Sequence, residues 1–359
     1  MKTEVVRLDR DNIDHEAIKR AGDIIKKGGL VAFPTETVYG LGGDALNPES
    51  SKKIYAAKGR PSDNPLIVHI ADMDHLSKIV DIIPEAAYKL ADAFWPGPMT
   101  VIMNKSDDVP LATTGGLQTV AVRMPVDKIA MELIQESGGY IAAPSANRSG
   151  RPSPTSAEYC VEDLDGVVEM ILDGGDVEIG LESSIIDLTE DVPMILRPGY
   201  ITLEMFRDVL GRVEVDQTIL SAQSKQAPKA PGMKYRHYAP KGDLTIVSGE
   251  EDSVVDYINS RAQEQMAKGE KVGIIATDST CSRYHADVIK DAGNRTDEHT
   301  VAHTLFRILR EFDDENVTIM YSESFESVGI GQAIMNRLLK AAGHKIVYLK
   351  ETKNDSDRM

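Results

Sequence analysis

The last third of the chain alternates short apolar segments with longer helical ones, and this alternation limits the possible folds more than any other feature. The segments DLTIVSG, KVGIIAT, VTIMYS and KIVYLK have the length and residue types of β-strands. The sequence predicts helices between them, at 251–268, 300–312 and 329–342. Strands that alternate with helices are typical of parallel sheets. We therefore predict a small, doubly wound α/β domain over residues 241–359.

The first 212 residues mix the two kinds of segment less regularly. Apolar spacing predicts a helix over 13–27, and a strand over 64–70 carries His69 near its end. Residues 213–240 are polar and contain prolines, so we predict a linker there between a first α/β domain at 1–212 and the second domain. Further helices are predicted near 47–57, 84–93, 126–137 and 202–210, and further strands at 99–103, 119–124 and 193–199, with two more inside 166–187.

The stretch from Gly28 to Gly43, GGLVAFPTETVYGLGG, joins an apolar run to hydroxyl groups and a glycine-rich turn. Read as one β-strand, it places Thr35 and Thr37 on the same face, where they would form a wall for a polar ligand. The alternative is a half-buried strand whose polar side chains face solvent, and Pro34 leaves the register open. Gly40 to Ala45 fits a dinucleotide fingerprint, but the next predicted helix begins too late to seat a pyrophosphate, so a tight turn is favoured.

Five cations of the first 212 residues stand at strand ends or in loops bounded by glycine or proline, where open α/β sheets collect ligands. One of these loops, at 140–156, is rich in small residues, hydroxyls and prolines, and is expected to bind or to turn rather than to fill a core. Cations and hydroxyls without a nucleophile suit the binding of phosphates and carboxylates. The candidates are Lys58, Arg60, Arg123, Arg151 and Arg197, with hydroxyls from Thr35, Thr37, Ser145, Ser153 and Ser183.

Composition and spacing argue against several other functions. The net charge of −17, with one Trp and six Phe, disfavours the rival hypothesis of an RNA-binding module, although a local basic cleft stays possible. Cys160 and Cys281 are far apart, which predicts neither a disulfide framework nor a thiolate metal site. His299 and His303 lack the glutamate of a zinc-protease motif, so no metal site from protein side chains is expected. Because no apolar run approaches membrane-spanning length, we expect a cytoplasmic protein without membrane contact.

Six segments match one known family in the right order. FPTETVYGLG at 33–42, KGRPSDNPLIVHI at 58–70, WPGPMT at 95–100, VAVRMP at 120–125, APSANRSGRPSPT at 143–155 and LRPG at 196–199 together resemble the YrdC-domain threonylcarbamoyl-AMP synthases. The segment PGMKYRHYAP before an α/β region is similar to the long, two-domain form with a C-terminal Rossmann-like domain. One departure is Ser184, where family members commonly carry Thr, but both residues keep a hydroxyl. The resemblance implies a twisted, mixed sheet with a concave, positively charged face in the first domain.

The resemblance also implies a reaction. L-Threonine, bicarbonate or CO2, and ATP would give threonylcarbamoyl-AMP and pyrophosphate, which makes the protein a nucleotidyltransferase. The product would supply the downstream tRNA threonylcarbamoyl transferase machinery, and direct RNA binding is left open. Mg²⁺ is expected with ATP, held mainly by phosphates and water. A carbamoyl transfer of the hydrogenase-maturation kind is the closer alternative, but no acylphosphatase-like or zinc-finger-like segment accompanies the domain.

The family pattern assigns roles to matching positions of this sequence. Arg123 would pair with the threonine carboxylate in a forked geometry that lysine could not reproduce. Tyr235 would hold the nucleotide, and His237 would join it in a lid that excludes water; a passive spacer is the alternative. The other threonine-binding residues implied are Thr35 or Thr37, His69, the Ala143 backbone and Ser183, and the ATP-binding residues are Lys58, Arg60, Asn64, Thr119, Ser145, Ser153 and Arg197.

Overall fold

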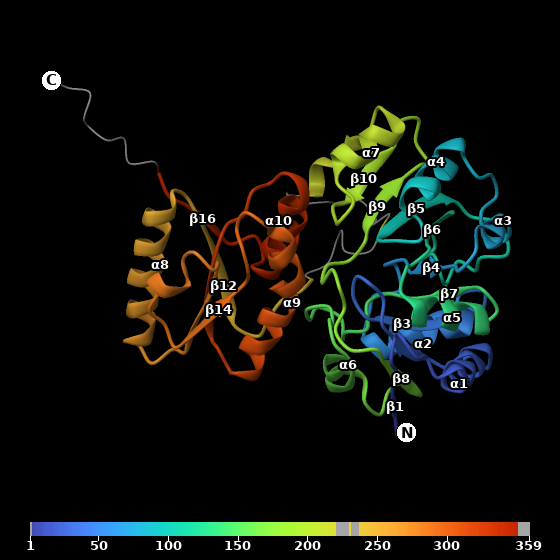
Figure 1. The fold of residues 1–359 in the computed structure, drawn as a ribbon, viewed down its shortest axis with the longest axis horizontal. Helices are drawn as coiled ribbons and strands as arrows, with labels where there is room; N and C mark the ends of the chain where they lie inside the picture. The colour runs from blue at the N-terminus through green and yellow to red at the C-terminus, as the bar shows by residue number, and fades with distance from the viewer. Residues whose placement is uncertain (1, 220–229, 231–236, 351–359) are drawn as a thin grey trace.

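The computed structural model describes residues 2–219, 230 and 237–350, and it contains two β-sheets (Figure 1). The first sheet has 11 strands in the order β1-β8-β2-β3-β7-β4-β6-β5-β9-β10-β11. Its strands are β1 (Glu4–Arg7), β2 (Val31–Phe33), β3 (Gly40–Asp44), β4 (Ile67–His69), β5 (Met99–Asn104), β6 (Thr119–Arg123), β7 (Ile141–Ala142), β8 (Met170–Asp173), β9 (Ser184–Asp187), β10 (Met194–Arg197) and β11 (Glu214–Val215).

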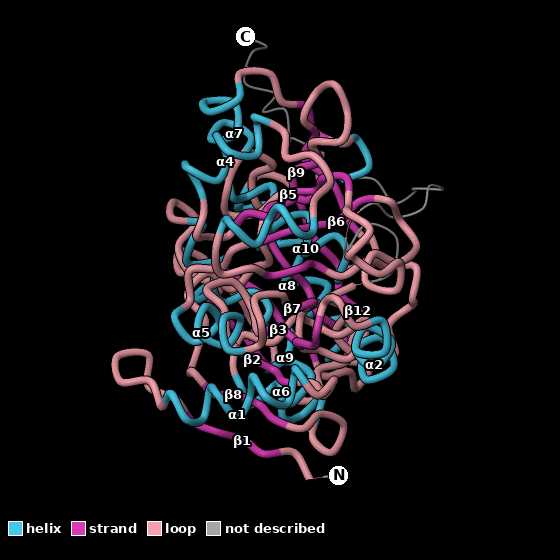
Figure 2. Tube along the Cα trace, turned by 90° about the vertical axis from the view of Figure 1, so that its right-hand side faces the viewer, coloured by secondary structure: helices cyan, strands magenta, loops and turns pink. Residues whose placement is uncertain are grey.

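This first sheet is mixed, as predicted for the first domain. β1 pairs with β8 and β5 with β9 in parallel, whereas β2 pairs with β3 and β5 with β6 in antiparallel fashion. Figures 1 and 2 show β1 and β8 at one end of the sheet and β9 toward the other. The sheet thus joins segments that lie far apart in the sequence, and the loops between its central strands meet near its middle.

Helices cover both faces of the first sheet because the strand side chains alternate between two cores. Val31 and Phe33 of β2 pack with α1 and α5, whereas Ala32 packs in the larger core formed with α2, α4, α6 and α7. The strong amphipathic pattern of α1 explains why its limits were predicted closely. The helices are α1 (His15–Lys26), α2 (Pro48–Lys58), α3 (Leu76–Ile79), α4 (Glu85–Phe94), α5 (Lys128–Glu136), α6 (Ala157–Leu164) and α7 (Leu203–Leu210).

The second sheet is parallel throughout and confirms the predicted doubly wound arrangement. Its five strands follow the order β14-β13-β15-β12-β16. Figure 1 shows α8 on one face of this sheet and α9 and α10 on the face turned toward the first sheet. The elements are β12 (Asp243–Ser248), α8 (Glu251–Met266), β13 (Val272–Ala276), β14 (Val288–Asp291), α9 (Glu298–Asp314), β15 (Ile319–Glu323), α10 (Gly329–Ala341) and β16 (Ile346–Tyr348).

The stretch 28–43 is not one strand, so the predicted alternation of Thr35 and Thr37 along a strand face is wrong. β2 and β3 form an antiparallel pair with Val31 opposite Gly42, and residues 34–39 form the connection. Pro34 has no N–H for a ladder. The Thr35 hydroxyl then accepts hydrogen bonds from the backbone N–H groups of Thr37 (3.1 Å) and Val38 (3.3 Å), which fixes a turn instead of a strand.

The segment 140–156 also departs from its prediction, because part of it does fill a core. Ile141 and Ala142 form the short strand β7 between β3 and β4 in the middle of the sheet. Ala142 and Ala146 are fully buried in the larger core. Small side chains fit here because neighbouring strands and helices approach closely; the rest of the segment is a loop, as predicted.

The two halves of the chain share apolar contacts. Val38 and Leu181 of the first half belong to the same core as Phe306 of α9, and Tyr238 stacks on Phe306 with ring centroids 4.9 Å apart. The domain limits at 212 and 240 stay predictions. Among the described residues, none of the helices combines the length and apolar character needed to cross a bilayer.

Candidate active site

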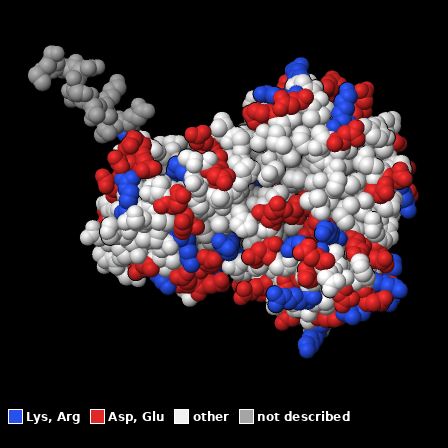
Figure 3. Space-filling view, in the orientation of Figure 1, with Lys and Arg blue, Asp and Glu red and all other residues white. Residues whose placement is uncertain are grey.

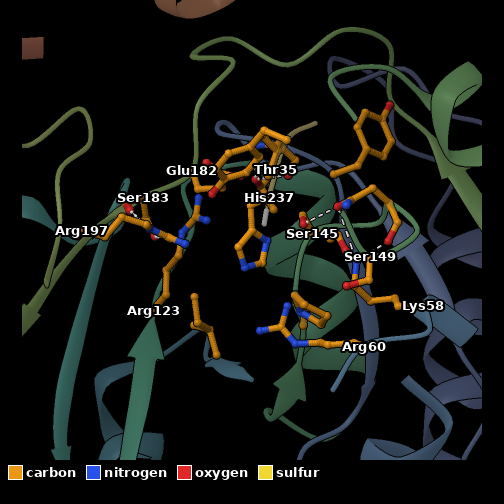
Figure 4. Close-up of a pocket in the computed structure, with 18 of the residues that line it drawn as sticks. Thr35, Lys58, Arg60, Arg123, Ser145, Ser149, Glu182, Ser183, Arg197 and His237 are labelled. Carbon is orange, nitrogen blue, oxygen red and sulfur yellow. Dashed lines mark hydrogen bonds between the residues drawn. The ribbon is translucent and has the colours of Figure 1, made fainter. Parts of the chain in front are cut away.

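A cavity lies where the β2–β3 connection, the ends of β4 and β6, and the end of β10 converge (Figure 4). Figure 4 shows two groups of polar side chains facing one another, with Arg123, Ser183 and Arg197 on one side and Lys58 and Arg60 on the other. The structure thereby brings together residues from segments more than a hundred positions apart. The predicted site residues that line the cavity are Thr35, Lys58, Arg60, His69, Arg123, Ala143, Ser145, Ser183, Arg197 and His237.

Arg123, the last residue of β6, is a buried cation with one carboxylate partner. Its Nη2 donates to Oε1 of Glu36 at 2.7 Å, and both side chains are almost fully buried. The second oxygen of Glu36 accepts a hydrogen bond from the Val126 N–H at 3.3 Å. Among the described residues, the buried Nε of Arg123 has no hydrogen-bond partner. Because Arg123 lines the cavity, this unpaired N–H marks the residue as a candidate partner for an acidic ligand.

His69 lies next to Arg123 because β4 and β6 pair in register at these two residues. Its Nδ1 is 3.1 Å from the carbonyl oxygen of Ile67. Burial, followed by the positive charge of Arg123, lowers the pKa of His69 to about 3. The imidazole is therefore neutral at physiological pH and offers the cavity a hydrogen-bonding group without a second charge.

Ser183 and Arg197 form a second polar unit on the same side. Arg197 Nε donates to the Ser183 carbonyl oxygen at 2.9 Å, and its Nη2 donates to the Ser183 hydroxyl at 3.1 Å. The same hydroxyl shares a 2.7 Å hydrogen bond with Thr100 of β5. Burial lowers the pKa of Arg197 to about 10, so the guanidinium stays charged at neutral pH.

Lys58 and Arg60 form the opposite side. Lys58 ends α2, and Gly59 follows it with φ 62°, a left-handed conformation that glycine adopts without strain. The Lys58 Nζ donates to the backbone carbonyl oxygens of Ser145 and Asn147. Burial, and then repulsion by Arg60, lowers the pKa of Lys58 well below its usual value. The approach of an anion between these cations would relieve both effects.

Glu182 is a lining residue that the sequence did not single out. Its Oε1 accepts a hydrogen bond from the Ser153 hydroxyl at 2.6 Å, and its Oε2 accepts one from Arg337 Nε of α10 at 3.1 Å. Burial raises the pKa of Glu182, but Arg337 and then Arg197 outweigh that effect and hold it below its ordinary value. The carboxylate is therefore ionised and fully engaged with protein groups.

The predicted linker residues are placed only in part. His237 lines the cavity, and Figure 4 shows it between the two polar groups. Burial lowers the pKa of His237 to about 3, so its ring is neutral. Tyr238, which was not predicted, also lines the cavity. Tyr235 lies outside the described residues.

Several predicted residues do not line the cavity. Thr37 is fully buried and its hydroxyl is 2.9 Å from that of Thr35. The Ser153 hydroxyl is occupied by Glu182. Asn64 is buried next to Arg60, whose Nε donates to its carbonyl oxygen at 3.1 Å. Thr119 begins β6 opposite Asn104. None of these four threonine, serine and asparagine side chains belongs to the lining formed by the described residues.

Arg151, predicted as part of the anion-binding set, does not line the cavity. Its guanidinium forms ion pairs with Asp163 and, at 2.7 Å, with Glu162, both on α6. These partners use its charge within the protein. The lining residues that sequence reasoning missed include Glu182, Asn147, Ser149 and Tyr238. Of these, Glu182 could have been found from its position directly before Ser183, a predicted site residue.

A metal ion would find few protein ligands in this cavity. Glu182 is the acidic residue of the lining, and both of its oxygens already accept hydrogen bonds. Among residues 2–219, 230 and 237–350, no group of three or more His, Cys, Asp and Glu side chains is arranged to hold a metal ion. The donor set therefore fits a cation that brings its own ligands, such as nucleotide phosphates and water.

The surface gives no support to nucleic-acid binding on the face that Figure 3 presents. Acidic and basic side chains are interspersed over both halves of that face, without a continuous basic stripe. Phosphate-backbone binding needs clustered lysines and arginines. The clustered cations described above are instead buried around the cavity.

Comparison with known proteins gives one consistent family. Residues 23–199 match the Sua5/YciO/YrdC family model, described as "Telomere recombination", and residues 201–343 match the model "Threonylcarbamoyl-AMP synthase, C-terminal domain". Curated threonylcarbamoyl-AMP synthases from Pyrococcus abyssi and Bacillus subtilis are each 47% identical, covering 94% and 92% of this chain and 97% and 94% of their own lengths.

A solved structure agrees with the sequence relatives. The crystal structure of P. abyssi Sua5 complexed with L-threonine is 45% identical, superposes with a TM-score of 0.93, and covers 97% of this chain and all of its own. A second structure, of a doubly substituted variant of P. abyssi Sua5, is also 45% identical, covers 97% of this chain and 98% of its own, and gives a TM-score of 0.92. The chain therefore belongs to the threonylcarbamoyl-AMP synthase family in its two-domain, Sua5 form.

Proposed function

We propose that this chain is an L-threonylcarbamoyladenylate synthase, which converts L-threonine, bicarbonate and ATP to threonylcarbamoyl-AMP and pyrophosphate. The observation that carries the proposal is the match over 97% of the chain to a protein crystallised with L-threonine. The buried cations of the cavity support it independently, because ATP and bicarbonate are anions and threonine carries a carboxylate. The product would supply the threonylcarbamoyl group for tRNA modification in the cytoplasm.

Threonine would bind on the side of the cavity formed by Arg123, His69 and Ser183. Arg123 has an unpaired Nε for the amino-acid carboxylate, while Glu36 holds its Nη2. The neutral His69 and the Ser183 hydroxyl would complete the contacts. Of the two threonines left open by the sequence, Thr35 is favoured because it lines the cavity.

ATP would bind on the opposite side, along Lys58, Arg60 and Ser145, whereas Arg197 lies with Ser183 on the threonine side. In the reaction, the amino nitrogen of threonine bonds to the carbon of bicarbonate, water leaves, and a carbamate forms. A carbamate oxygen then attacks the α-phosphorus of ATP, and pyrophosphate leaves. No protein nucleophile is needed, so the residues would act by positioning and by stabilising negative charge.

Mg²⁺ would neutralise phosphate charge in this reaction. We propose that it enters with ATP and is held by phosphate oxygens and water, since Glu182 is engaged by Ser153 and Arg337. The chain's own contribution would be the cations Lys58 and Arg60, which face the same phosphates. Chelation should then abolish turnover without changing threonine binding.

The test is pyrophosphate release by the full chain with each substrate omitted in turn, with the adenylate identified by mass spectrometry. We expect release to require L-threonine, bicarbonate and ATP together. L-Serine, which lacks the methyl group, should be a poorer substrate. Release that is independent of threonine, or equal turnover with serine, would contradict the substrate assignment.

A further inference from the structure

The second domain sends two fully buried arginines into the first domain. Arg310 of α9 and Arg337 of α10 both have 0% exposure. Each guanidinium meets a buried carboxylate of the first domain, Asp163 for Arg310 and Glu182 for Arg337. A buried arginine is rare unless it is paired, so we expect the loss of either contact to destabilise the packing between the two domains. Only one of the two carboxylates, Glu182, lines the cavity.

Arg337 contacts two backbone segments as well as the Glu182 side chain. Its Nε donates to Glu182 Oε2 at 3.1 Å, and its Nη2 donates to the Glu182 carbonyl oxygen at 3.2 Å. Its Nη1 donates to the carbonyl oxygen of Pro198. One planar guanidinium thus ties together the chain at 182 and the chain at 198.

These two segments carry the groups that face the cavity. Ser183 directly follows Glu182, and Arg197 directly precedes Pro198. Arg197 in turn donates to both the carbonyl and the hydroxyl of Ser183, at 2.9 and 3.1 Å. Arg337, which does not line the cavity itself, therefore contacts both of these segments from behind, in addition to the pairing of β9 with β10.

Electrostatics point the same way. Glu182 is buried, and burial favours the uncharged form of a carboxyl group, yet its pKa lies below the ordinary value because Arg337 and Arg197 both act on it. Without Arg337, Arg197 would remain as the arginine that lowers this pKa. Glu182 would then attract Arg197 away from Ser183.

We propose that Arg337, supplied by the C-terminal domain, is a positioning residue for the threonine side of the active site, acting through Glu182 and the Pro198 carbonyl on Ser183 and Arg197. This inference rests on the proposed function. It gives the C-terminal domain a role in the geometry of the first domain's cavity.

Arg310 provides a matched control. It is as buried as Arg337, and its guanidinium donates to Asp163 at 2.7 Å and to the Pro152 carbonyl oxygen at 2.7 and 3.1 Å. Neither of these partners lines the cavity. Arg310→Met and Arg337→Met should therefore damage domain docking to a similar degree, and they should differ in their effect on threonine.

The experiment measures the threonine KM of the full chain and, by calorimetry, the affinity for L-threonine, together with thermal unfolding. Arg337→Met should weaken threonine binding about tenfold or more, as expected when a buried, hydrogen-bonded charge loses its partner. Arg310→Met should leave the threonine KM within about twofold. Arg337→Lys keeps the charge but not the three contacts, so an intermediate loss is expected.

Each outcome bears on one hypothesis. A folded Arg337→Met variant with unchanged threonine KM would overturn the inference, as would an equal loss in Arg310→Met, which would point to docking alone. If Arg337→Met does not fold, Arg337→Lys decides the question, and a wild-type threonine KM in that variant overturns the inference. A wild-type protein that neither binds threonine nor needs it for pyrophosphate release would instead remove the proposed function.

Discussion

Each sheet has a buried, charged side chain at the end of one strand. The two side chains differ in how many of their hydrogen-bonding groups have partners. Glu323, the last residue of β15, is 2% exposed and accepts hydrogen bonds from Tyr284 at 2.9 Å and Thr277 at 3.3 Å, and also from Thr280 and Arg295. Arg123, the last residue of β6, has Glu36 as its partner and a buried Nε without one among the described residues.

The difference separates a structural charge from a binding charge. Both oxygens of Glu323 have partners, so this carboxylate stabilises the fold. Arg295 also has a buried Nε without a partner among the described residues, but of the two arginines only Arg123 lines the cavity, where such an N–H can gain from a ligand. We call these two sets the Glu323 cluster (Thr277, Thr280, Tyr284, Arg295 and Glu323) and the Arg123 pair (Arg123 and Glu36). The comparison predicts that mutations in the Arg123 pair affect activity and that mutations in the Glu323 cluster affect stability.

The largest effect is expected from Arg123→Ala. Removing the guanidinium takes away the proposed carboxylate ligand and leaves Glu36 buried without its cation. Threonine-dependent pyrophosphate release should fall by at least about 100-fold. Arg123→Lys should not restore it, because lysine cannot form the forked contact. Near-normal turnover in the alanine variant would contradict a role of the Arg123 pair in substrate binding.

Glu323→Gln tests the structural role of the Glu323 cluster. The neutral amide cannot satisfy Arg295 and the three hydroxyl donors, Thr277, Thr280 and Tyr284, equally well, so the free energy of unfolding should fall by about 1–3 kcal/mol. The threonine KM should stay within about twofold of wild type, since the cluster is separate from the cavity lining. Chemical denaturation and steady-state kinetics measure the two quantities. A raised threonine KM at unchanged stability would reverse the proposed distinction.

Gly180→Ala tests how the two regions are joined. A Cβ at Gly180, which has φ +85°, would lie 2.6 Å from the Ala302 carbonyl oxygen and 2.5 Å from that of His303 on α9. Strain and clash together should lower the free energy of unfolding by roughly 1–2 kcal/mol and loosen the contact between the domains. Gly269→Ala is the matched control, because Gly269 has the same φ with nothing within 4 Å. Equal destabilisation by both variants would mean that backbone strain alone is at work.

The smallest effect at neutral pH concerns the charge state of His69, because this effect appears only as the pH falls. Its pKa is about 3 in the folded protein, below the ordinary 6.5, so its contribution to stability is complete above pH 6.5 and is lost as the pH falls from 6.5 toward 3. The slope is at most about 1.4 kcal/mol per pH unit. Urea unfolding from pH 7 to 4 should therefore show a shallower decline in His69→Gln than in wild type. The exposed His285→Gln variant should match wild type, and parallel curves for all three proteins would contradict a buried, neutral His69.

The sequence was sufficient where local pattern decides structure. Four of the five strands of the second sheet, and the helices between them, followed from alternating apolar segments, whereas β14 was not predicted. The cations of the cavity were found because they end strands or bound loops. The sequence was insufficient at 34–39, where the Thr35 hydroxyl accepts hydrogen bonds from two backbone N–H groups and forms a turn. It was also insufficient at β7, a strand of only two residues. The ion pairs formed by residues of the cavity lining were missed for a different reason. Glu36 and Arg123 are 87 positions apart, and Glu182 and Arg337 are 155 apart, so no spacing rule connects them.

The 155 positions between Glu182 and Arg337 also set an order of events during protein synthesis. A ribosome adds roughly 5–20 residues per second, so on the order of ten to thirty seconds separate the emergence of these two side chains. Throughout that interval the nascent chain carries Glu182 without the cation that completes its surroundings. The strands of the first domain can pair early. The surroundings of Ser183, however, are complete only after α10 has been translated and has packed against the first domain.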